Sequence, residues 1–205
     1  MHPCLKHVTA RSCTYIYTLS TSSANFSKGK RTKMRNVEIK AKISNPEALV
    51  EKAKRLSKSD GVIMKQHDVF FLVSKGRLKL RKFENGTGEL IYYERPDTKG
   101  PKLSSYSKVD LSAEGAEGVK EVLSQAYGIL GSVEKTRQLF IVDQTRIHID
   151  KVSNLGDFME LEVVLRDDQD IAIGQKISQD LMKQLEIAEE DTISVAYLDL
   201  LTIKE

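Results

Sequence analysis

The sequence predicts an α+β fold in which an antiparallel sheet or barrel is flanked by helices. About eight strand-like segments occur along the chain, with only two or three helical segments at intervals between them. A doubly wound parallel sheet needs roughly one helix after each strand and is therefore disfavoured. Most strand segments also alternate apolar and charged residues, which is typical of strands with one dry face and one polar face.

The first strand is expected at residues 37–43, where apolar and charged residues alternate strictly. A helix should follow, with Asn45 as its N-cap and Pro46 in its first turn. Apolar residues at helical spacing within residues 48–56 form its buried stripe, and Gly61 is the expected stop.

Four further strands are expected before the next helix. An Asn-Gly-containing turn at residues 84–89 links the second and third of them, which favours a hairpin. The strands are expected at residues 66–73, 77–81, 90–95 and 102–111.

The C-terminal part alternates in the same way between helices and strands. A helix is expected from Ser112, a possible N-cap, to Tyr127, with Gly128 as its stop. An amphipathic helix should occupy residues 168–185, and residues 195–201 should form a short closing helix or strand. Between the two long helices, three strands are expected at residues 133–142, 145–152 and 158–165.

The N-terminal segment differs in composition from the rest of the chain. The 205 residues carry a net charge of +3, yet the first 37 contain seven basic residues, ten Ser or Thr and no acid, which leaves −4 on the remainder. This composition resembles a mitochondrial transit peptide; the alternative is translated sequence upstream of a start at Met34. We therefore expect a basic leader without a core over residues 1–35 and a folded domain over residues 36–205. The expected location is cytoplasmic, or mitochondrial if the leader is a transit peptide.

Several classes of protein are disfavoured by what the sequence lacks. No stretch of about 18 apolar residues is present, so no membrane partner is expected. The two cysteines, Cys4 and Cys13, lie in the leader, so the domain has no disulfide, Cys-rich zinc site or Cys nucleophile. The domain is mildly acidic and has no aromatic-rich RNA-binding strand, so nucleic acid is not the expected partner.

The polar faces of the strands carry an excess of cations. They hold nine Lys or Arg against four acids, although the domain as a whole is negative. An ordinary antiparallel sheet with a solvated charged face is the alternative interpretation, but such a face usually mixes signs. The cations are Lys40, Lys42, Arg77, Lys79, Arg81, Arg95, Lys135, Arg137 and Arg146, and the acids are Glu38, Asp150, Glu160 and Glu162.

A sheet that closes with these faces inward would enclose a cationic tunnel. Repulsion among inward cations is costly in a low-dielectric space, and a polyanionic ligand relieves it. A linear polyphosphate suits such a tunnel because its oxygens match Arg forks and Lys charges. Glu160 and Glu162 point the same way along one strand, and with the other acids they could hold a hard divalent cation.

Five segments, in order, resemble motifs of the CYTH superfamily, the triphosphate tunnel metalloenzymes. The opening pattern of that family, Glu-x-Glu-x-Lys, is similar to Glu38 to Lys42, and the further segments are residues 77–81, 89–97, 133–137 and 146–162. The last segment is the most specific and is similar to the class IV adenylyl cyclase-like branch. The resemblance covers most of the expected domain.

This resemblance implies an eight-stranded antiparallel β-barrel, open as a tunnel, that binds a triphosphate with Mg or Mn. Thiamine triphosphatase, inorganic and RNA triphosphatases and class IV adenylyl cyclases are members of the family. The residues implied to bind substrate are Lys40, Lys42, Arg77, Lys79, Arg81, Arg95, Lys135, Arg137 and Arg146. The implied metal ligands are Glu38, Asp150, Glu160 and Glu162, of which the last three are also the expected catalytic residues.

One position departs from the family pattern as aligned from Glu38. Lys40 stands where the second Glu is expected, which should weaken metal binding and puts a second metal ion in doubt. Lys40 is expected either to touch phosphate or to pair with Glu38. Two alternatives are open for His148: it faces the lumen, or it forms a hydrogen bond with Asp150. Residues 102–108 either line the tunnel or form an exposed edge strand.

The expected function is a Mg- or Mn-dependent enzyme that hydrolyses a phosphoanhydride bond of a triphosphate. Tripolyphosphate, ATP and thiamine triphosphate are the candidate substrates. One alternative is the class IV cyclase reaction, which converts ATP to cyclic AMP and pyrophosphate. Another is a protein that binds triphosphate or polyphosphate without turnover. A homodimer is one open expectation for its assembly.

Overall fold

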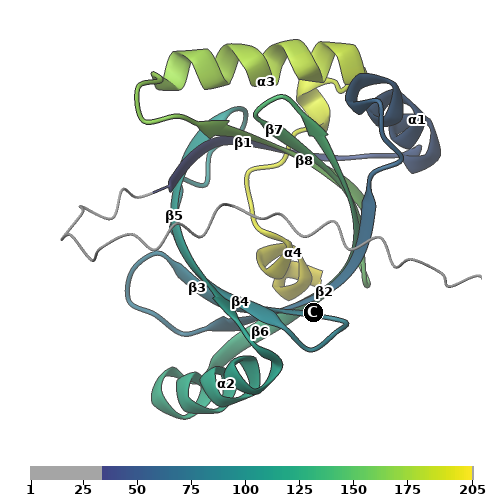
Figure 1. Ribbon diagram of the computed structural model, residues 1–205. Helices are drawn as coiled ribbons and strands as arrows, with labels where there is room; N and C mark the ends of the chain where they lie inside the picture. Colours follow the sequence, from purple (N-terminus) through teal and green to yellow (C-terminus); the bar gives the residue numbers. More distant parts are fainter. Residues whose placement is uncertain (1–33, 205) are drawn as a thin grey trace, which may run out of the picture. The chain divides into compact units, whose positions relative to one another are not determined.

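The computed structural model describes residues 34–204, in which eight antiparallel strands form a closed barrel (Figure 1). Around the barrel the strands follow the order β1-β5-β4-β3-β2-β6-β7-β8, and β8 pairs with β1 to close it. The strands are β1 (Met34–Lys42), β2 (Val62–Phe71), β3 (Arg77–Phe83), β4 (Gly88–Glu94), β5 (Lys102–Leu111), β6 (Ile129–Val142), β7 (Thr145–Val152) and β8 (Gly156–Leu165). The α-helices are α1 (Pro46–Ser57), α2 (Ala113–Tyr127), α3 (Ile171–Leu185) and α4 (Tyr197–Lys204), with a 3₁₀ turn at Glu189–Asp191.

The predicted α+β barrel flanked by helices is confirmed, and each expected strand is present. The leader expected over residues 1–35 lies outside the described residues, except that Met34 and Arg35 open β1. The undecided segment at residues 195–201 is helical, because α4 covers Tyr197–Lys204. Among the helices of residues 34–204, none has the length and apolar character needed to cross a membrane.

Local capping explains where the helices begin and end. The Asn45 side chain accepts a hydrogen bond from the Ala48 amide at 3.0 Å, as the sequence predicted. Helix α1 stops at Ser57 rather than at Gly61, because Lys58 adopts a left-handed conformation with φ of 53°. The Ser112 hydroxyl caps α2 by accepting from the Gly115 amide at 3.1 Å.

The hydrophobic core lies outside the barrel, between the strands and the covering helices. Ile39, Ile147 and Leu161 point outward and are buried under α1 and α3 through residues such as Leu49 and Leu185. Helix α2 covers the opposite side of the barrel, over β2 and β3 (Figure 1). Because the apolar face of each strand points toward a helix, its charged face must point into the lumen.

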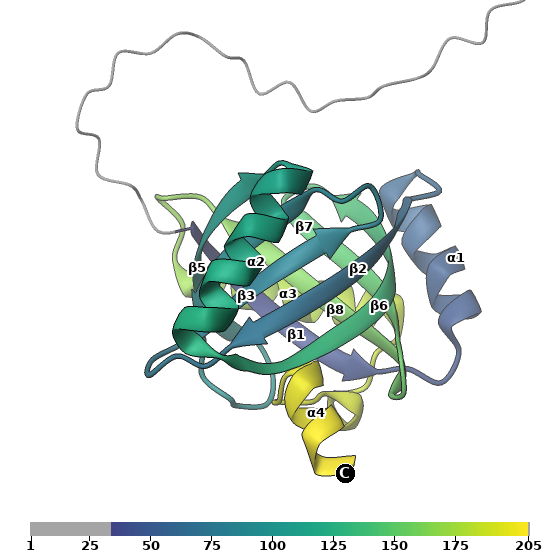
Figure 2. The same ribbon diagram turned by 90° about the horizontal axis from the view of Figure 1, so that it is seen from below.

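Helix α4 lies across one end of the barrel (Figures 1 and 2). It approaches β6 closely because residue 131 is a glycine: a Cβ there would lie 2.6 Å from Leu198 Cδ1. The Asp199 carboxylate accepts a hydrogen bond from Arg77 at 3.1 Å, and the Tyr197 ring packs against Phe158 with centroids 5.0 Å apart. Tyr197 therefore reaches the interior at this end of the barrel, which we call the α4 end.

Candidate functional site: the barrel lumen

The barrel encloses a cavity of about 820 Å³, lined by side chains from every strand and by Tyr197 of α4. An eight-stranded barrel is just wide enough to hold its own side chains or one small ligand. Three of the four predicted acids line this cavity, namely Glu38, Glu160 and Glu162. Seven of the nine predicted cations also line it, namely Lys40, Lys79, Arg81, Arg95, Lys135, Arg137 and Arg146.

Three predicted site residues do not line the cavity. Lys42 is exposed at the end of β1. Arg77 lies at the α4 end, where it pairs with Asp97 at 3.0 Å as well as with Asp199. Asp150 is fully buried, so its carboxylate is not presented to the lumen surface.

Asp150 instead holds two side chains of the lumen, Arg137 and Tyr197, in place. Its carboxylate accepts two hydrogen bonds from Arg137, at 2.6 and 2.5 Å, and one from the Tyr197 hydroxyl at 3.0 Å. Burial alone would raise the pKa of Asp150, but Arg137 outweighs it and holds that pKa below its usual range. The geometry makes Asp150 the group that orients Arg137, and a metal ion would have to displace these bonds to reach it.

The lumen face of β1 shows where the opening family pattern lies. Asn36, Glu38 and Lys40 line the cavity, whereas Lys42, which still pairs with β8 opposite Phe158, is exposed and does not line it. Of the three residues of the pattern as read from Glu38, the first two therefore line the cavity and the third, Lys42, does not. Of the two alternatives for Lys40, the pairing with Glu38 is wrong, since Lys40 pairs with Glu160 and Glu38 with Arg95.

A buried acid that the sequence reasoning missed gathers three cations on one side of the lumen. Asp68 accepts hydrogen bonds from Lys79 at 2.9 Å, from Arg81 at 2.8 Å and from Lys135 at 2.8 Å. Burial would raise its pKa, but Arg81, Lys135 and Lys79 together hold that pKa well below its usual range. In the sequence, Gln66, Asp68 and Phe70 alternate within a segment that was predicted as a strand from its β-forming residues. This alternation could have placed Asp68 on the lumen face.

Lys135 has an unusually acidic ammonium group. Burial, together with the neighbouring Arg81, Arg137 and Lys79, lowers its pKa to about 7, although the charge of Asp68 acts in the opposite direction. A polyanion in the lumen would favour the charged form. The charge on this side chain therefore depends on what occupies the cavity.

Glu160 is the shared acid on the opposite side of the lumen. Its carboxylate pairs with Lys40 and, at 2.7 Å, with Arg137. Burial would raise its pKa, but Lys40 and Arg137 outweigh burial and hold that pKa well below its usual range. Glu160 is thus ionised at neutral pH and held between two cations.

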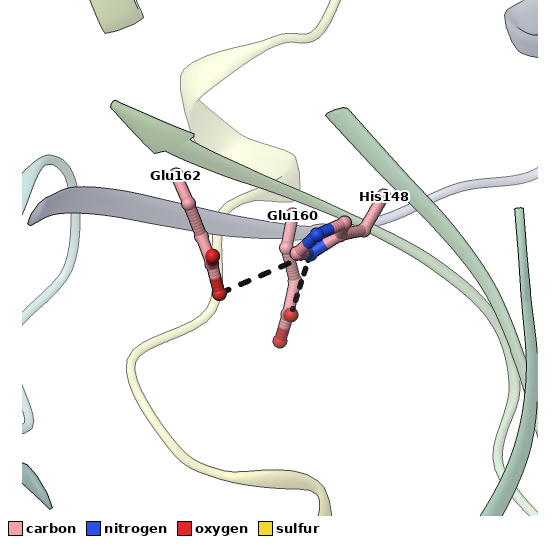
Figure 3. A group of neighbouring side chains, drawn as sticks. All are labelled: His148, Glu160 and Glu162. Carbon is pink, nitrogen blue, oxygen red and sulfur yellow. Dashed lines mark ion pairs between the residues drawn. The ribbon is translucent and has the colours of Figure 1, made fainter. Parts of the chain in front are cut away.

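His148 points toward Glu160 and Glu162 on the neighbouring strand (Figure 3). Its Nδ1 lies 3.5 Å from Glu160 Oε2 and 3.9 Å from Glu162 Oε1. One ligand atom from each of the three residues lies within 4.8 Å of the other two. His148 is therefore a lumen residue, and the set of two carboxylates and one imidazole fits a divalent cation.

Strand β5 lines the lumen rather than forming an edge. It pairs with β1 on one side and β4 on the other, so the alternative of an exposed edge strand is wrong. Ser104, Tyr106 and Lys108 face the cavity. Lys102 is buried at the α4 end, donates to the Thr98 and Ser194 carbonyls at 2.9 Å each, and has its pKa lowered by burial to about 8.

Comparisons with known proteins agree with this barrel. The sequence profile of the CYTH domain matches residues 34–197, ending where α4 begins. A Methanocaldococcus jannaschii protein that is provisionally named as an adenylate cyclase is 29% identical over 182 residues, which cover 82% of this chain and 98% of that protein.

Solved structures give the same fold. The PH1012 protein of Pyrococcus horikoshii superposes with a TM-score of 0.69 at 25% identity, covering 80% of this chain and 98% of its own. A protein of Vibrio parahaemolyticus, also provisionally named as an adenylate cyclase, superposes with a TM-score of 0.67 at 20% identity and covers 83% of this chain and 98% of its own. The similarity to the Vibrio protein shows a shared fold only.

Proposed function

Because the chain belongs to the CYTH domain family, we propose that its lumen binds a triphosphate with Mg²⁺ or Mn²⁺ and that the protein cleaves a phosphoanhydride bond of this ligand. The observation that carries the proposal is the convergence of seven predicted cationic side chains on one cavity of about 820 Å³. Such a density of inward cations is costly without a polyanion and well matched to one.

The cations form two groups that face each other across the lumen. Lys79, Arg81 and Lys135 meet at Asp68 on one side, while Lys40 and Arg137 meet at Glu160 on the other. The two acids hold the cations in place before a ligand arrives. A phosphate chain lying between the groups would give each cation further oxygen partners, and Arg137 is already oriented by Asp150.

Hydrolysis is the simpler of the candidate reactions, because the site has to position only a water molecule beside the triphosphate. A water oxygen forms a bond to the terminal phosphorus, the bond from that phosphorus to the bridging oxygen breaks, and the remaining diphosphate end leaves with that oxygen. The proton of the water passes to solvent. A divalent cation held by Glu160 and Glu162 would neutralise charge on the phosphate oxygens. The side chains of Lys79, Lys135 and Arg137 stabilise the charge that develops on the transferred group and on the leaving end.

The lining of the cavity supports an organic triphosphate over inorganic tripolyphosphate. Met64, Phe83 and Leu139 line it toward the end opposite α4, where β2 begins and where β3 and β6 end. A volume of about 820 Å³ is within the range of about 300–1,000 Å³ that is typical of pockets for drug-sized organic ligands. This apolar part of the cavity has no phosphate-binding role and suits a base or ring system.

Cyclisation of ATP is the second candidate, and the name of the Methanocaldococcus relative favours it. In that reaction the ribose 3′-oxygen forms a bond to the α-phosphorus, and the bond from this phosphorus to its bridging oxygen breaks to release pyrophosphate. Both reactions use the same cationic lumen. They differ in which phosphorus lies beside the carboxylates.

Product analysis tests the proposal. The full chain is incubated with tripolyphosphate, ATP or thiamine triphosphate and with Mg²⁺ or Mn²⁺, and the products are resolved by ³¹P NMR and chromatography. We expect phosphate release from an organic triphosphate, and its loss in Glu160→Gln. Formation of cyclic AMP and pyrophosphate from ATP would contradict hydrolysis and favour the cyclisation reaction. Tight binding with no product from any substrate would contradict the enzyme and favour a binding protein.

A further inference from the structure

We infer that His148 Nδ1 is a third ligand of the divalent cation, beside Glu160 and Glu162, and that this mixed nitrogen–oxygen site prefers Mn²⁺ over Mg²⁺. The inference rests on the proposed metal requirement and goes further by naming an imidazole ligand and the preferred ion. Its starting point is that a polar ring atom in the lumen has no adequate partner.

His148 is deeply buried, with 4% of its surface exposed. Its Nδ1 has no hydrogen-bond partner among the described residues, because the Glu160 oxygen at 3.5 Å is beyond the usual hydrogen-bond range of about 2.7–3.2 Å. A buried polar atom without a partner is rare in folded proteins and calls for a ligand, ion or water. The atom faces the two carboxylates of β8 (Figure 3).

The register of β7 and β8 fixes this arrangement. His148 lies directly opposite Glu160, and Glu162 is two residues further along the same face of β8. Two atoms that bind one ion at about 2.1 Å are about 3 Å apart when adjacent and about 4.2 Å apart when opposite. The distances from Nδ1 to the two carboxylates, 3.5 and 3.9 Å, fall in that interval. An ion can therefore be held without moving a strand.

The surroundings leave few other oxygen ligands for this ion. Arg95 pairs with Glu38, Asp150 is fully buried and bonded to Arg137 and Tyr197, and Asn36, which also lines the cavity, is uncharged. A neutral imidazole adds a donor atom and requires no further counter-charge. His148 thus supplies a donor atom that has no cation partner among the described residues, whereas Glu160 is shared with Lys40 and Arg137, and Glu162 is shared with Arg146.

The donor set determines which ion binds best. Mg²⁺ takes oxygen ligands almost exclusively and gives up its water reluctantly, so an imidazole adds little to its binding. Mn²⁺ lies higher than Mg²⁺ in affinity for nitrogen donors, while it still accepts carboxylates. A site of one imidazole and two carboxylates should therefore bind Mn²⁺ more tightly than Mg²⁺.

The test uses Mn²⁺ as an electron paramagnetic resonance probe, with the full chain and no substrate. Titration measures the fraction of Mn²⁺ bound, competition with Mg²⁺ measures the preference, and pulsed spectra report nitrogen coupling to the bound ion. We expect tighter binding of Mn²⁺ than of Mg²⁺ and a nitrogen coupling in the unmodified chain. In His148→Gln the coupling should disappear and Mn²⁺ affinity should fall by about tenfold or more, while Mg²⁺ affinity changes little.

The matched control is His67→Gln, which removes a histidine on β2 that does not line the cavity. This variant should keep the coupling and the affinity. His2 and His7 are present in both variants. A nitrogen coupling that survives in His148→Gln would therefore come from another histidine and would overturn the inference. His148→Asn provides a second variant, and thermal unfolding checks that both remain folded.

The outcomes separate this inference from the proposed function. Bound Mn²⁺ without nitrogen coupling overturns the role of His148 and leaves a carboxylate site for the proposed reaction. Equal affinities for the two ions overturn the Mn²⁺ preference. A failure to bind either ion, together with turnover in the absence of metal, overturns the metal site as a whole.

Discussion

Lys40 and Glu160 face each other across β1 and β8, and the Lys40 ammonium forms an ion pair with the Glu160 carboxylate inside the lumen. The same ammonium lies 3.5 Å from the centre of the Tyr197 ring. Glu160 thus has Lys40 on one side and Arg137 on the other. A divalent cation would have to share Glu160 with Lys40 and Arg137, and a phosphate chain would have to share these two cations with Glu160.

Lys40 should therefore favour phosphate binding and oppose metal binding. In Lys40→Gln we expect triphosphate affinity to fall by about tenfold, equivalent to about 1.4 kcal/mol, and affinity for Mn²⁺ to rise, because a competing cation is gone. Calorimetric titrations with tripolyphosphate and with Mn²⁺ measure both. Lys42→Gln is the control, since Lys42 is exposed outside the cavity. If both affinities stay unchanged in Lys40→Gln, Lys40 is not part of the site.

Asp68 should stabilise the empty lumen by balancing three cations. Asp68→Asn leaves Lys79, Arg81 and Lys135 without their shared acid, and breaking a buried ion pair in this way costs about 3–5 kcal/mol of unfolding free energy. Tripolyphosphate should restore more stability to this variant than to the unmodified chain, because the anion replaces the missing charge. Urea unfolding with and without tripolyphosphate measures the effect.

Asp110→Asn is the comparison for this prediction, because Asp110 is an exposed acid that also pairs with a lysine. It should cost no more than about 1 kcal/mol and respond normally to tripolyphosphate. Equal responses of the two variants to tripolyphosphate would show that the ligand does not replace the charge of Asp68.

Lys135 should make triphosphate binding depend on pH near neutrality. Since its pKa is lowered to about 7, the free protein carries this charge below pH 7 and loses it above. Anion affinity should therefore decline as pH rises from 6 to 8.5, by up to about tenfold per pH unit above 7. Lys135→Arg keeps its charge throughout this range.

The ratio of the two affinities isolates the effect, because ionisation of the ligand itself affects both proteins alike. We expect the affinity of the unmodified chain, divided by that of Lys135→Arg, to fall over this pH interval. A ratio that stays constant would mean that Lys135 does not titrate there.

Tyr197 should link α4 to the lumen. Tyr197→Phe keeps the ring beside Lys40 but removes the hydroxyl that donates to Asp150 at 3.0 Å. A buried acceptor left with one bond fewer should cost about 1–3 kcal/mol of stability, and turnover should fall because Arg137 is held less firmly. Tyr127→Phe changes an exposed tyrosine and should alter neither quantity. Unchanged turnover in Tyr197→Phe would confine α4 to a structural role.

Period-two alternation made the strands and the inward cations predictable from sequence. It places Lys79 and Arg81, or Glu160 and Glu162, on one face without further information. The same rule does not tell where a strand leaves the barrel, so Lys42 was assigned to the lumen together with Lys40. Both residues pair with β8, and only their exposure and the extent of the cavity separate the two.

The residues that sequence reasoning missed depend on contacts between distant segments. Asp68 draws its partners from β3 and β6, and Tyr197 reaches Asp150 from the last helix, 47 positions along the chain. Arg77 has the right spacing for a lumen cation, but Asp97 and Asp199 hold it at the α4 end. Such pairings arise from the fold as a whole, so the alternation that places Asp68 on one face of its strand does not identify its partners.

The measurement that most directly tests the central claim is a calorimetric titration of tripolyphosphate into the full chain and into Arg146→Gln. Arg146 lines the lumen but is only partly buried, so its loss should leave the fold intact. The account predicts salt-sensitive binding to the unmodified chain, about tenfold or more weaker in Arg146→Gln and unchanged in Lys42→Gln. Absence of binding to the unmodified chain, or equal binding to Arg146→Gln, would contradict a triphosphate site in the barrel.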